Sequence, residues 1–474
     1  MPTAATDVSN AMAYIYKMRG IKAQFTRWDD TLRHFRAAST IMEGERKVFK
    51  AWTQPMTATR LTKSGYESEF PEDQKLDAQE YYVTWSDLSE AQTTVAFTGL
   101  AQAKTTKGGR RAAIWSIANK LIDEVDADHA TRLNAAVHQD ANCTMATIDT
   151  LYNAAGTGAY SSGAAYAKIK AGSISQFFKG QKLHVRNGSS TSTPRCIVEV
   201  NDVFPFNEGP DGTRARGPGI RFTYSAAGAD SDLGNVAADD DLCLSNEAAD
   251  NFWGFPTWFS RTAAVVNLTR TSTGNAWTIP PIKWFDASGD GTGASVTFDL
   301  DTHLGEVAEE LAYAVKYGRR TRASEGIELT TKAMTMLTTP RIVSEASGMV
   351  GDQMRYAMSL GDPERKKYFG VTGYDGAFWH HPLLGPIAFQ PDPVATPDVL
   401  RMLEPNSWTW VIGHQGGIND VEWLDKDGNK FHYPFGANAR LINRLVGGAL
   451  RRVTLICDQP GANLQLGGVK SSRQ

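Results

Sequence analysis

The feature that most constrains this fold is a long helical pattern between Arg110 and Val137. Apolar residues recur there at helical spacing, and acidic residues crowd the other positions. At 1.5 Å per residue, a helix over this range is roughly 40 Å long. We therefore expect a single long helix with an apolar stripe formed by Ile114, Ile117, Ala118, Leu121, Val125, Leu133, Ala136 and Val137.

Four basic residues precede or open this helix: Lys104, Lys107, Arg110 and Arg111. The positive end of a helix dipole disfavours cations there by a few tenths of a kcal/mol each. One interpretation is a solvated entry turn. The other is that these side chains meet acidic groups on a neighbouring subunit, which makes them candidate contacts between subunits.

Composition indicates a mixed α+β protein. The 474 residues allow two to four domains, and 43 glycines, 20 prolines and 12 tryptophans favour many turns and much sheet. A net charge of -3 argues against a dedicated nucleic-acid binder. The four scattered cysteines show neither disulfide nor zinc spacing and are expected to be small buried hydrophobes. No apolar run or signal peptide indicates a membrane partner, so we expect synthesis in the cytoplasm.

The chain before the long helix has little core of its own. Residues 1–50 are interpreted as an N-terminal arm, and residues 51–106 as a long extended hairpin containing two β-type runs, 81–85 and 94–97. A monomer with such a hairpin exposes aromatic side chains, which favours burial on a second copy. The candidate contact residues in the hairpin are Trp52, Tyr81, Tyr82, Trp85 and Phe97.

Later segments divide the rest of the chain. Residues 107–175 carry the long helix, and residues 176–248 hold evenly spaced short strands that predict an inserted, barrel-like β domain. Strand-like residues follow over 249–300. Residues 301–440 are expected to hold helices at 302–317 and from Lys332 to Pro340, with strands at 326–330, 386–389, 408–412 and 421–424. Residues 441–474 are expected to supply closing strands at 441–445 and 452–457, then a tail.

The sequence shows none of the common chemical motifs. The phosphate loop, dinucleotide fingerprint, GxSxG and HExxH are absent. His380 and His381 are adjacent, so in an extended segment they point to opposite faces and do not share a metal easily. We therefore expect no catalytic residues, no cofactor-binding residues and no metal site, and a structural protein in place of an enzyme.

The order of elements resembles the major capsid protein of tailed bacteriophages, the Hong Kong 97-type fold. The helix 110–137 with its exit at 149–158 is similar to that family's spine helix, and 302–337 is similar to the opening of its axial domain. The passage Gly385-Pro-Ile-Ala-Phe-Gln-Pro-Asp392-Pro393 resembles a strand of the family, and 444–464 resembles its closing strand. The resemblance implies an N-terminal arm, an extended hairpin termed the E-loop, and peripheral and axial domains.

What the resemblance implies is a virion protein that assembles in the host cytoplasm. It forms hexamers and pentamers of an icosahedral shell around double-stranded DNA, which it contacts non-specifically. A separate scaffolding protein, a portal protein and a cement or decoration protein are the further partners. Two alternatives stay open: an encapsulin-type compartment shell, and a carbohydrate-active enzyme suggested by the many Trp and Asp residues.

Overall fold

The computed structural model describes the following part of the chain: residues 31, 35–42, 44–51, 79–98, 111–187, 194–204, 209–210, 218–227, 233–244, 252–260, 265, 283–286, 296–299, 303, 305, 334–346, 348–349, 378–381, 385–413, 421–424, 444–457 and 463–471. The expected helix 302–317 lies almost wholly outside these residues, and the strand 326–330 lies wholly outside them.

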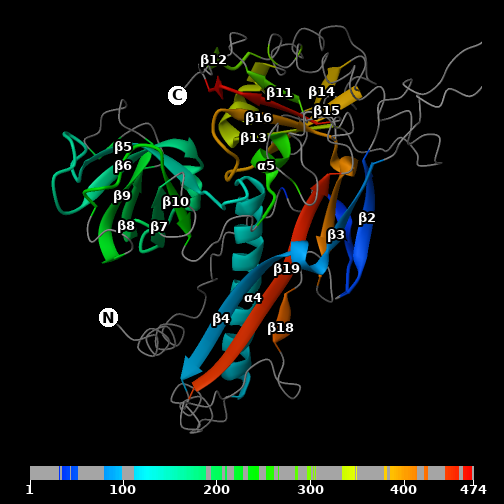
Figure 1. Ribbon diagram of the computed structural model, residues 1–474, viewed down its shortest axis with the longest axis horizontal. Helices are drawn as coiled ribbons and strands as arrows, with labels where there is room; N and C mark the ends of the chain where they lie inside the picture. The colour runs from blue at the N-terminus through cyan, green and yellow to red at the C-terminus, as the bar shows by residue number, and fades with distance from the viewer. Residues whose placement is uncertain are drawn as a thin grey trace, which may run out of the picture.

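The expected long helix is confirmed as α4, which spans Arg111–Val137 and has 27 residues. It lies alongside two long antiparallel strands, β4 (Ser89–Thr98) and β19 (Arg444–Cys457) (Figure 1). The closing strands expected at 441–445 and 452–457 are thus one continuous strand of 14 residues. A strand of that length runs from the core past the helix (Figure 1).

The strand β19 has neighbours on both edges. Leu450 is the partner of Gln92 in β4 and of Glu422 in β18 (Glu422–Leu424), so these two strands lie on opposite edges. The edge that β18 occupies continues with β17 (Trp408–Ile412), which pairs with the end of β19 and in parallel with β1 (Arg36–Thr40). Residues 36–40, expected to be part of an arm, therefore belong to this central sheet.

The hairpin before the helix differs from the expectation. The run at 81–84 lies in β3 (Gln79–Thr84), which pairs antiparallel with β2 (Arg46–Ala51). The run at 94–97 lies in β4, which pairs with β19. The two runs thus belong to different sheets. Local β propensity does not reveal which distant strand supplies the hydrogen bonds. The segment 52–78 between β2 and β3 lies outside the described residues.

A closed barrel follows α4, with the strand order β10-β5-β6-β9-β8-β7. The four strands expected between 176 and 248 are present, but β5 and β6 precede residue 176. The barrel therefore begins at Ala146, and the expected domain boundary was too late. The strands are β5 (Ala146–Asn153), β6 (Ala165–Gly172), β7 (Lys182–Asn187), β8 (Cys196–Phe204), β9 (Gly219–Ala227) and β10 (Asp240–Leu244).

A mixed six-stranded sheet has the order β11-β20-β16-β13-β15-β14. It draws one strand from the expected 249–300 segment and one from the C-terminal tail, so the expected domains interleave here. A smaller parallel pair joins β12 (Val296–Thr297) to β21 (Val469–Lys470). The six strands are β11 (Lys283–Asp286), β13 (Met334–Thr338), β14 (Phe378–His381), β15 (Gly385–Pro391), β16 (Val399–Leu403) and β20 (Leu464–Gly467).

The helix expected from Lys332 to Pro340 was wrong, because residues 334–338 form β13. This strand pairs with β15 on one edge and β16 on the other, and all five of its residues are buried. A strand buried on both faces lacks the alternation that identifies a strand in sequence. Helix begins only at Pro340, a residue well suited to the first helical position.

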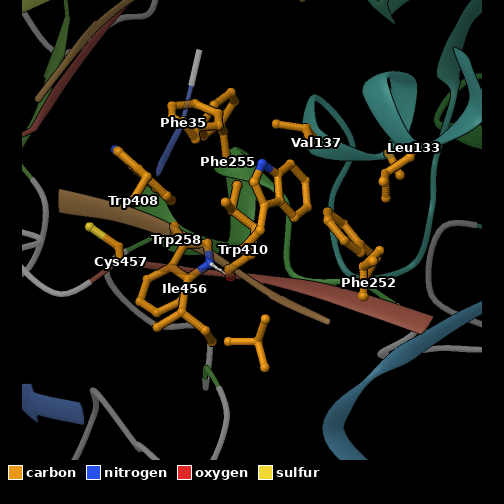
Figure 2. Packing of buried hydrophobic residues seen from close by; sticks show 14 of the residues in the cluster. Phe35, Leu133, Val137, Phe252, Phe255, Trp258, Trp408, Trp410, Ile456 and Cys457 are labelled. Atoms are coloured by element: carbon orange, nitrogen blue, oxygen red, sulfur yellow. Dashed lines mark hydrogen bonds between the residues drawn. The ribbon is translucent and has the colours of Figure 1, made fainter. Parts of the chain in front are cut away.

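The main core lies where α4, β17, β19 and the short helix α5 (Phe255–Phe259) meet (Figure 2). Trp258, Trp408 and Trp410 are fully buried there, and the Trp258 indole N–H donates to the carbonyl of Leu455 at 3.1 Å. The Phe255 and Trp408 rings meet edge to face with centroids 5.2 Å apart. The helical conformation of α5 departs from the expected strand at this point. All four cysteines are buried, as expected.

Candidate functional site

The predicted contact residues that the structure describes are spread over four elements. Tyr81 and Tyr82 lie on β3, Trp85 begins the 3-10 helix η1 (Trp85–Asp87), and Phe97 lies on β4 opposite Leu445. Arg111 is the first residue of α4. Trp52, Lys104, Lys107 and Arg110 lie outside the described residues.

The two faces of the two-stranded ribbon β2–β3 differ in their exposure to solvent. Val83 is fully buried in the main core, whereas its neighbour Tyr82 points the other way and is 38% exposed. The guanidinium of Arg46 lies 5.4 Å from the centre of the Tyr82 ring. Within the described residues, β2 and β3 pair with no further strand. The ribbon thus has one anchored face and one aromatic, basic face open to solvent.

Trp85 is held within its own chain more than expected. It packs against the main core, and the Arg452 guanidinium lies 5.0 Å from its ring centre. Arg452 also reaches Glu90 at 3.4 Å, across the paired strands β4 and β19. Of the predicted hairpin aromatics whose side chains the structure describes, Tyr82 is therefore the better candidate for a contact with another molecule.

A polar seam joins α4 to the β4–β19 pair. The buried guanidinium of Arg451 forms an ion pair with Asp126 at 3.0 Å, and His129 Nε2 lies 2.7 Å from the Thr93 hydroxyl. Burial, and then the charge of Arg451, lower the pKa of His129 to about 4. The His129 ring is therefore neutral near pH 7, and the seam carries one buried cation with one carboxylate.

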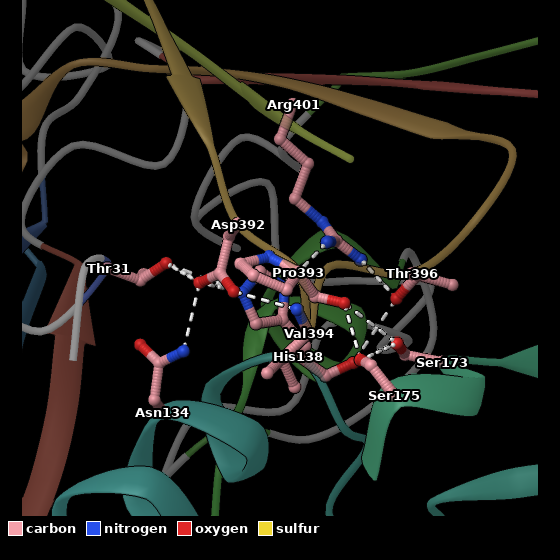
Figure 3. A network of polar contacts seen from close by, with 10 residues as sticks. All are labelled: Thr31, Asn134, His138, Ser173, Ser175, Asp392, Pro393, Val394, Thr396 and Arg401. Carbon is pink, nitrogen blue, oxygen red and sulfur yellow. Dashed lines mark hydrogen bonds and ion pairs between the residues drawn. The ribbon is translucent and has the colours of Figure 1, made fainter. Parts of the chain in front are cut away.

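A second polar cluster, which we call the junction, lies at the C-terminal end of α4 (Figure 3). His138 follows the last helical residue, and its amide still bonds to Ala135, so the helix fixes its position. Its ring lies between Asp392, at 3.1 Å from Nε2, and Arg401, at 3.2 Å from Nδ1. The side chains of both His138 and Asp392 are fully buried.

The sequence Asp392-Pro393-Val394-Ala395 explains how the carboxylate is placed. The Ala395 amide bonds to the Asp392 carbonyl, which closes a turn with proline at its second position. The Asp392 side chain accepts the Val394 amide at 2.8 Å on one oxygen. On the other oxygen it accepts Asn134 at 3.0 Å and the Thr31 hydroxyl. The turn thus aims the carboxylate at α4.

Arg401 comes to the junction from β16. Its Nε donates to Gln465 at 3.0 Å, the direct partner of Arg401 across the β16–β20 pair. Its guanidinium also lies 5.2 Å from the Phe255 ring centre, so an aromatic face covers the cation. Strands β16 and β20 are therefore tied through one side chain to the end of α4.

The barrel meets the same junction. The hydroxyls of Ser173 and Ser175 donate to the Pro393 carbonyl, and Gln139 donates to Gln176 of the 3-10 helix η2 (Ile174–Gln176). Residues from the barrel, from α4 and from the six-stranded sheet therefore meet within one set of hydrogen bonds.

Electrostatics fix the charge state of the junction. Burial lowers the pKa of His138, so the ring is neutral near pH 7. Burial alone raises the pKa of Asp392, but His138, Thr31 and Val394 together lower it to about 2. Burial lowers the pKa of Arg401 to about 9, which leaves it charged near pH 7. The junction thus holds one anion, one cation and one neutral imidazole, with a net charge of zero.

Sequence reasoning missed the junction. Asp392 was noted only as part of a strand motif, and His138 and Arg401 were not singled out, because they lie more than 250 positions apart in the chain. In the part of the chain with defined coordinates, no group of three His, Cys, Asp or Glu residues could hold a metal. In that same part, no helix is long and apolar enough to cross a membrane.

Comparison with known proteins gives one class of similar structure. No protein-family model and no curated protein matches the chain. The capsid of cyanophage A-1(L) matches with a TM-score of 0.45 and 9% identity, covering 96% of this chain and 97% of that chain. The capsid of a native GTA particle matches with a TM-score of 0.41 and 11% identity over 96% of each chain.

An encapsulin is also among the similar structures. The SrpI encapsulin of Synechococcus elongatus PCC 7942 matches with a TM-score of 0.39 and 9% identity, covering 97% of this chain and 96% of that chain.

Proposed function

We propose that this chain is a shell-forming protein of the Hong Kong 97 type, and that it is the major capsid protein of a tailed bacteriophage. The observation that carries the proposal is the β2–β3 ribbon, which is anchored by Val83 and presents Tyr82 and Arg46 to solvent. A ribbon with one exposed aromatic face gains stability when a second copy covers that face.

The helix and its strands supply the rigid part of such a subunit. The helix α4 is held to β19 by the Asp126–Arg451 ion pair and to β4 by the contact between His129 and Thr93, and the barrel and the six-stranded sheet lie toward one end of this helix (Figure 1). Repeated contacts between rigid subunits around symmetry axes close a shell. The role of the protein is accordingly structural.

We place the protein in the virion, as hexamers and pentamers assembled in the host cytoplasm with a separate scaffolding protein and a portal protein. The small net charge fits non-specific contact with packaged DNA. The barrel is the proposed place for a cement protein.

Deletion of residues 63–75 tests the role of the ribbon in assembly. This segment lies between β2 and β3, outside the described residues. The shortened chain is expected to fold, as judged by its circular dichroism, and to form fewer particles than the full chain in negative-stain images. Normal particle yield from the shortened chain contradicts the proposal. The contents of native particles, DNA or a protein cargo, separate a phage head from an encapsulin-type compartment.

A further inference from the structure

The two hydrogen bonds of the His138 ring determine which of its nitrogens carries the proton. Arg401 has donors only, so His138 Nδ1 accepts from it at 3.2 Å. The proton of the neutral ring is therefore on Nε2, which donates to Asp392 at 3.1 Å. Both ring nitrogens are in use, and the chain of bonds runs from cation to imidazole to carboxylate.

A second proton on His138 disrupts this chain. Nδ1 then carries a hydrogen that faces the Arg401 guanidinium, and a donor meets a donor at 3.2 Å. The junction also changes from zero net charge to one uncompensated buried positive charge. Either His138 or Arg401 must move. Arg401 donates hydrogen bonds to Gln465 of β20 and to Thr396 of the 392–396 turn, so movement of Arg401 disturbs both segments.

We propose that the junction is an acid-sensitive lock: it holds the barrel and the six-stranded sheet on the end of α4, and it opens when His138 takes up a second proton. This inference is independent of the proposed function, because it concerns contacts within one chain. The lock acts on the barrel through Ser173 and Ser175, which bond to the turn that carries Asp392.

The groups that face His138 come from each element around it. The charged groups are Asp392 from the turn after β15 and Arg401 from β16; Thr31 is a neutral hydroxyl and Phe255 of α5 contributes its ring edge. On α4 itself, Asn134 shares the Asp392 oxygen that His138 contacts. Burial lowers the pKa of His138, whereas an opened junction restores an ordinary value of about 6.5.

The direction of the pH effect follows from this difference. The closed junction binds fewer protons than the open one below about pH 6.5, so acid favours opening. At pH 5 the open form is favoured more than at pH 7, by at most about 25-fold, because an ordinary imidazole gains its proton over that range. Protonation of Asp392 contributes only at much lower pH, since its pKa is about 2.

Hydrogen exchange of the full chain at pH 7 and pH 5 tests the lock, after correction for the intrinsic pH dependence of amide exchange. Peptides covering 173–176 and 392–396 are expected to exchange faster at pH 5, by up to about 25-fold, while β5–β10 stay protected. In His138→Gln the glutamine can accept from Arg401 and donate to Asp392 without titrating, so the increase is expected to vanish. The matched control His303→Gln, outside the junction, is expected to behave like the wild type.

Three results overturn the lock: no increase at pH 5 in the wild type, an equal increase in His138→Gln, or simultaneous loss of protection throughout the barrel. If His138→Gln does not fold, exchange of the imidazole C2 hydrogen in the wild type measures the pKa of His138 directly. A value below 6.5 supports the lock, and a value of 6.5 or above contradicts it.

Discussion

Ala146 and Leu242 are direct partners across strands β5 and β10, so the barrel begins and ends at adjacent backbone positions. The Met145 amide extends this pairing with a bond to the Leu242 carbonyl at 2.9 Å. A unit whose two ends are neighbours can be inserted into a surrounding domain without displacing the rest of the chain.

Excision of residues 146–244 is therefore expected to leave a folded chain when a short Gly/Ser linker joins the ends. Excision of 176–248 is expected to fail, because it leaves β5 without its partner β10 and β6 without its partner β9. Circular dichroism and thermal unfolding of the two shortened chains check this. If both shortened chains lose cooperative unfolding equally, the barrel is not an insertable unit.

Gly254→Ala is expected to lower the free energy of unfolding by roughly 2 kcal/mol or more, because overpacking against a fixed backbone has no easy relief. A Cβ atom at this position clashes with the carbonyl oxygen of Gln139 and lies 2.6 Å from that of Ala136, at the end of α4. Urea unfolding measures the change. The control is Gly348→Ala, where a Cβ meets nothing within 4 Å; similar losses in both variants contradict the clash.

His129→Gln is expected to reduce the acid sensitivity of the protein between about pH 6.5 and pH 4. The pKa of His129 is about 4 in the folded chain and about 6.5 when unfolded, so the unfolded state binds more protons in this range and stability falls as pH falls. This difference in the pKa of His129 between the folded and unfolded chain lowers the free energy of unfolding by about 3 kcal/mol at pH 4. Urea midpoints measured across this range check it, and an unchanged pH slope in the variant contradicts it.

Tyr82→Ser is expected to raise the protein concentration needed for assembly several-fold with little change in unfolding temperature, because the part of the ring that is exposed in one chain is covered only by a second copy. Tyr224→Ser is the matched control, since Tyr224 is a tyrosine of nearly equal exposure, 37%, on barrel strand β9. Light scattering during assembly compares the two. If both substitutions raise the concentration needed for assembly equally, the ribbon has no special role in assembly.

Local sequence patterns predicted the long helix and several of the barrel strands. The range 110–137 for α4 differs from the structure by one residue, because a sustained apolar stripe is a strong signal. The barrel strands between 182 and 244 were also found, since each is bounded by turn residues. By contrast, Met334 and Met336 sit in a strand buried on both faces, where helix and strand patterns look alike.

Long-range pairing could not be predicted in the same way. The register of β4 on β19 joins Phe97 to Leu445, and no periodicity within either segment encodes that partner. The junction is the extreme case, because His138, Asp392 and Arg401 are unremarkable residues until the fold brings them together. Their role depends on burial, which a single sequence does not display.

Imaging of the purified chain tests the central claim most directly. Negative-stain electron microscopy of the expressed full-length protein, at increasing concentration, is expected to show closed icosahedral particles built of many identical copies. A chain that stays monomeric at high concentration, with a sharp molecular mass by light scattering, contradicts the shell function.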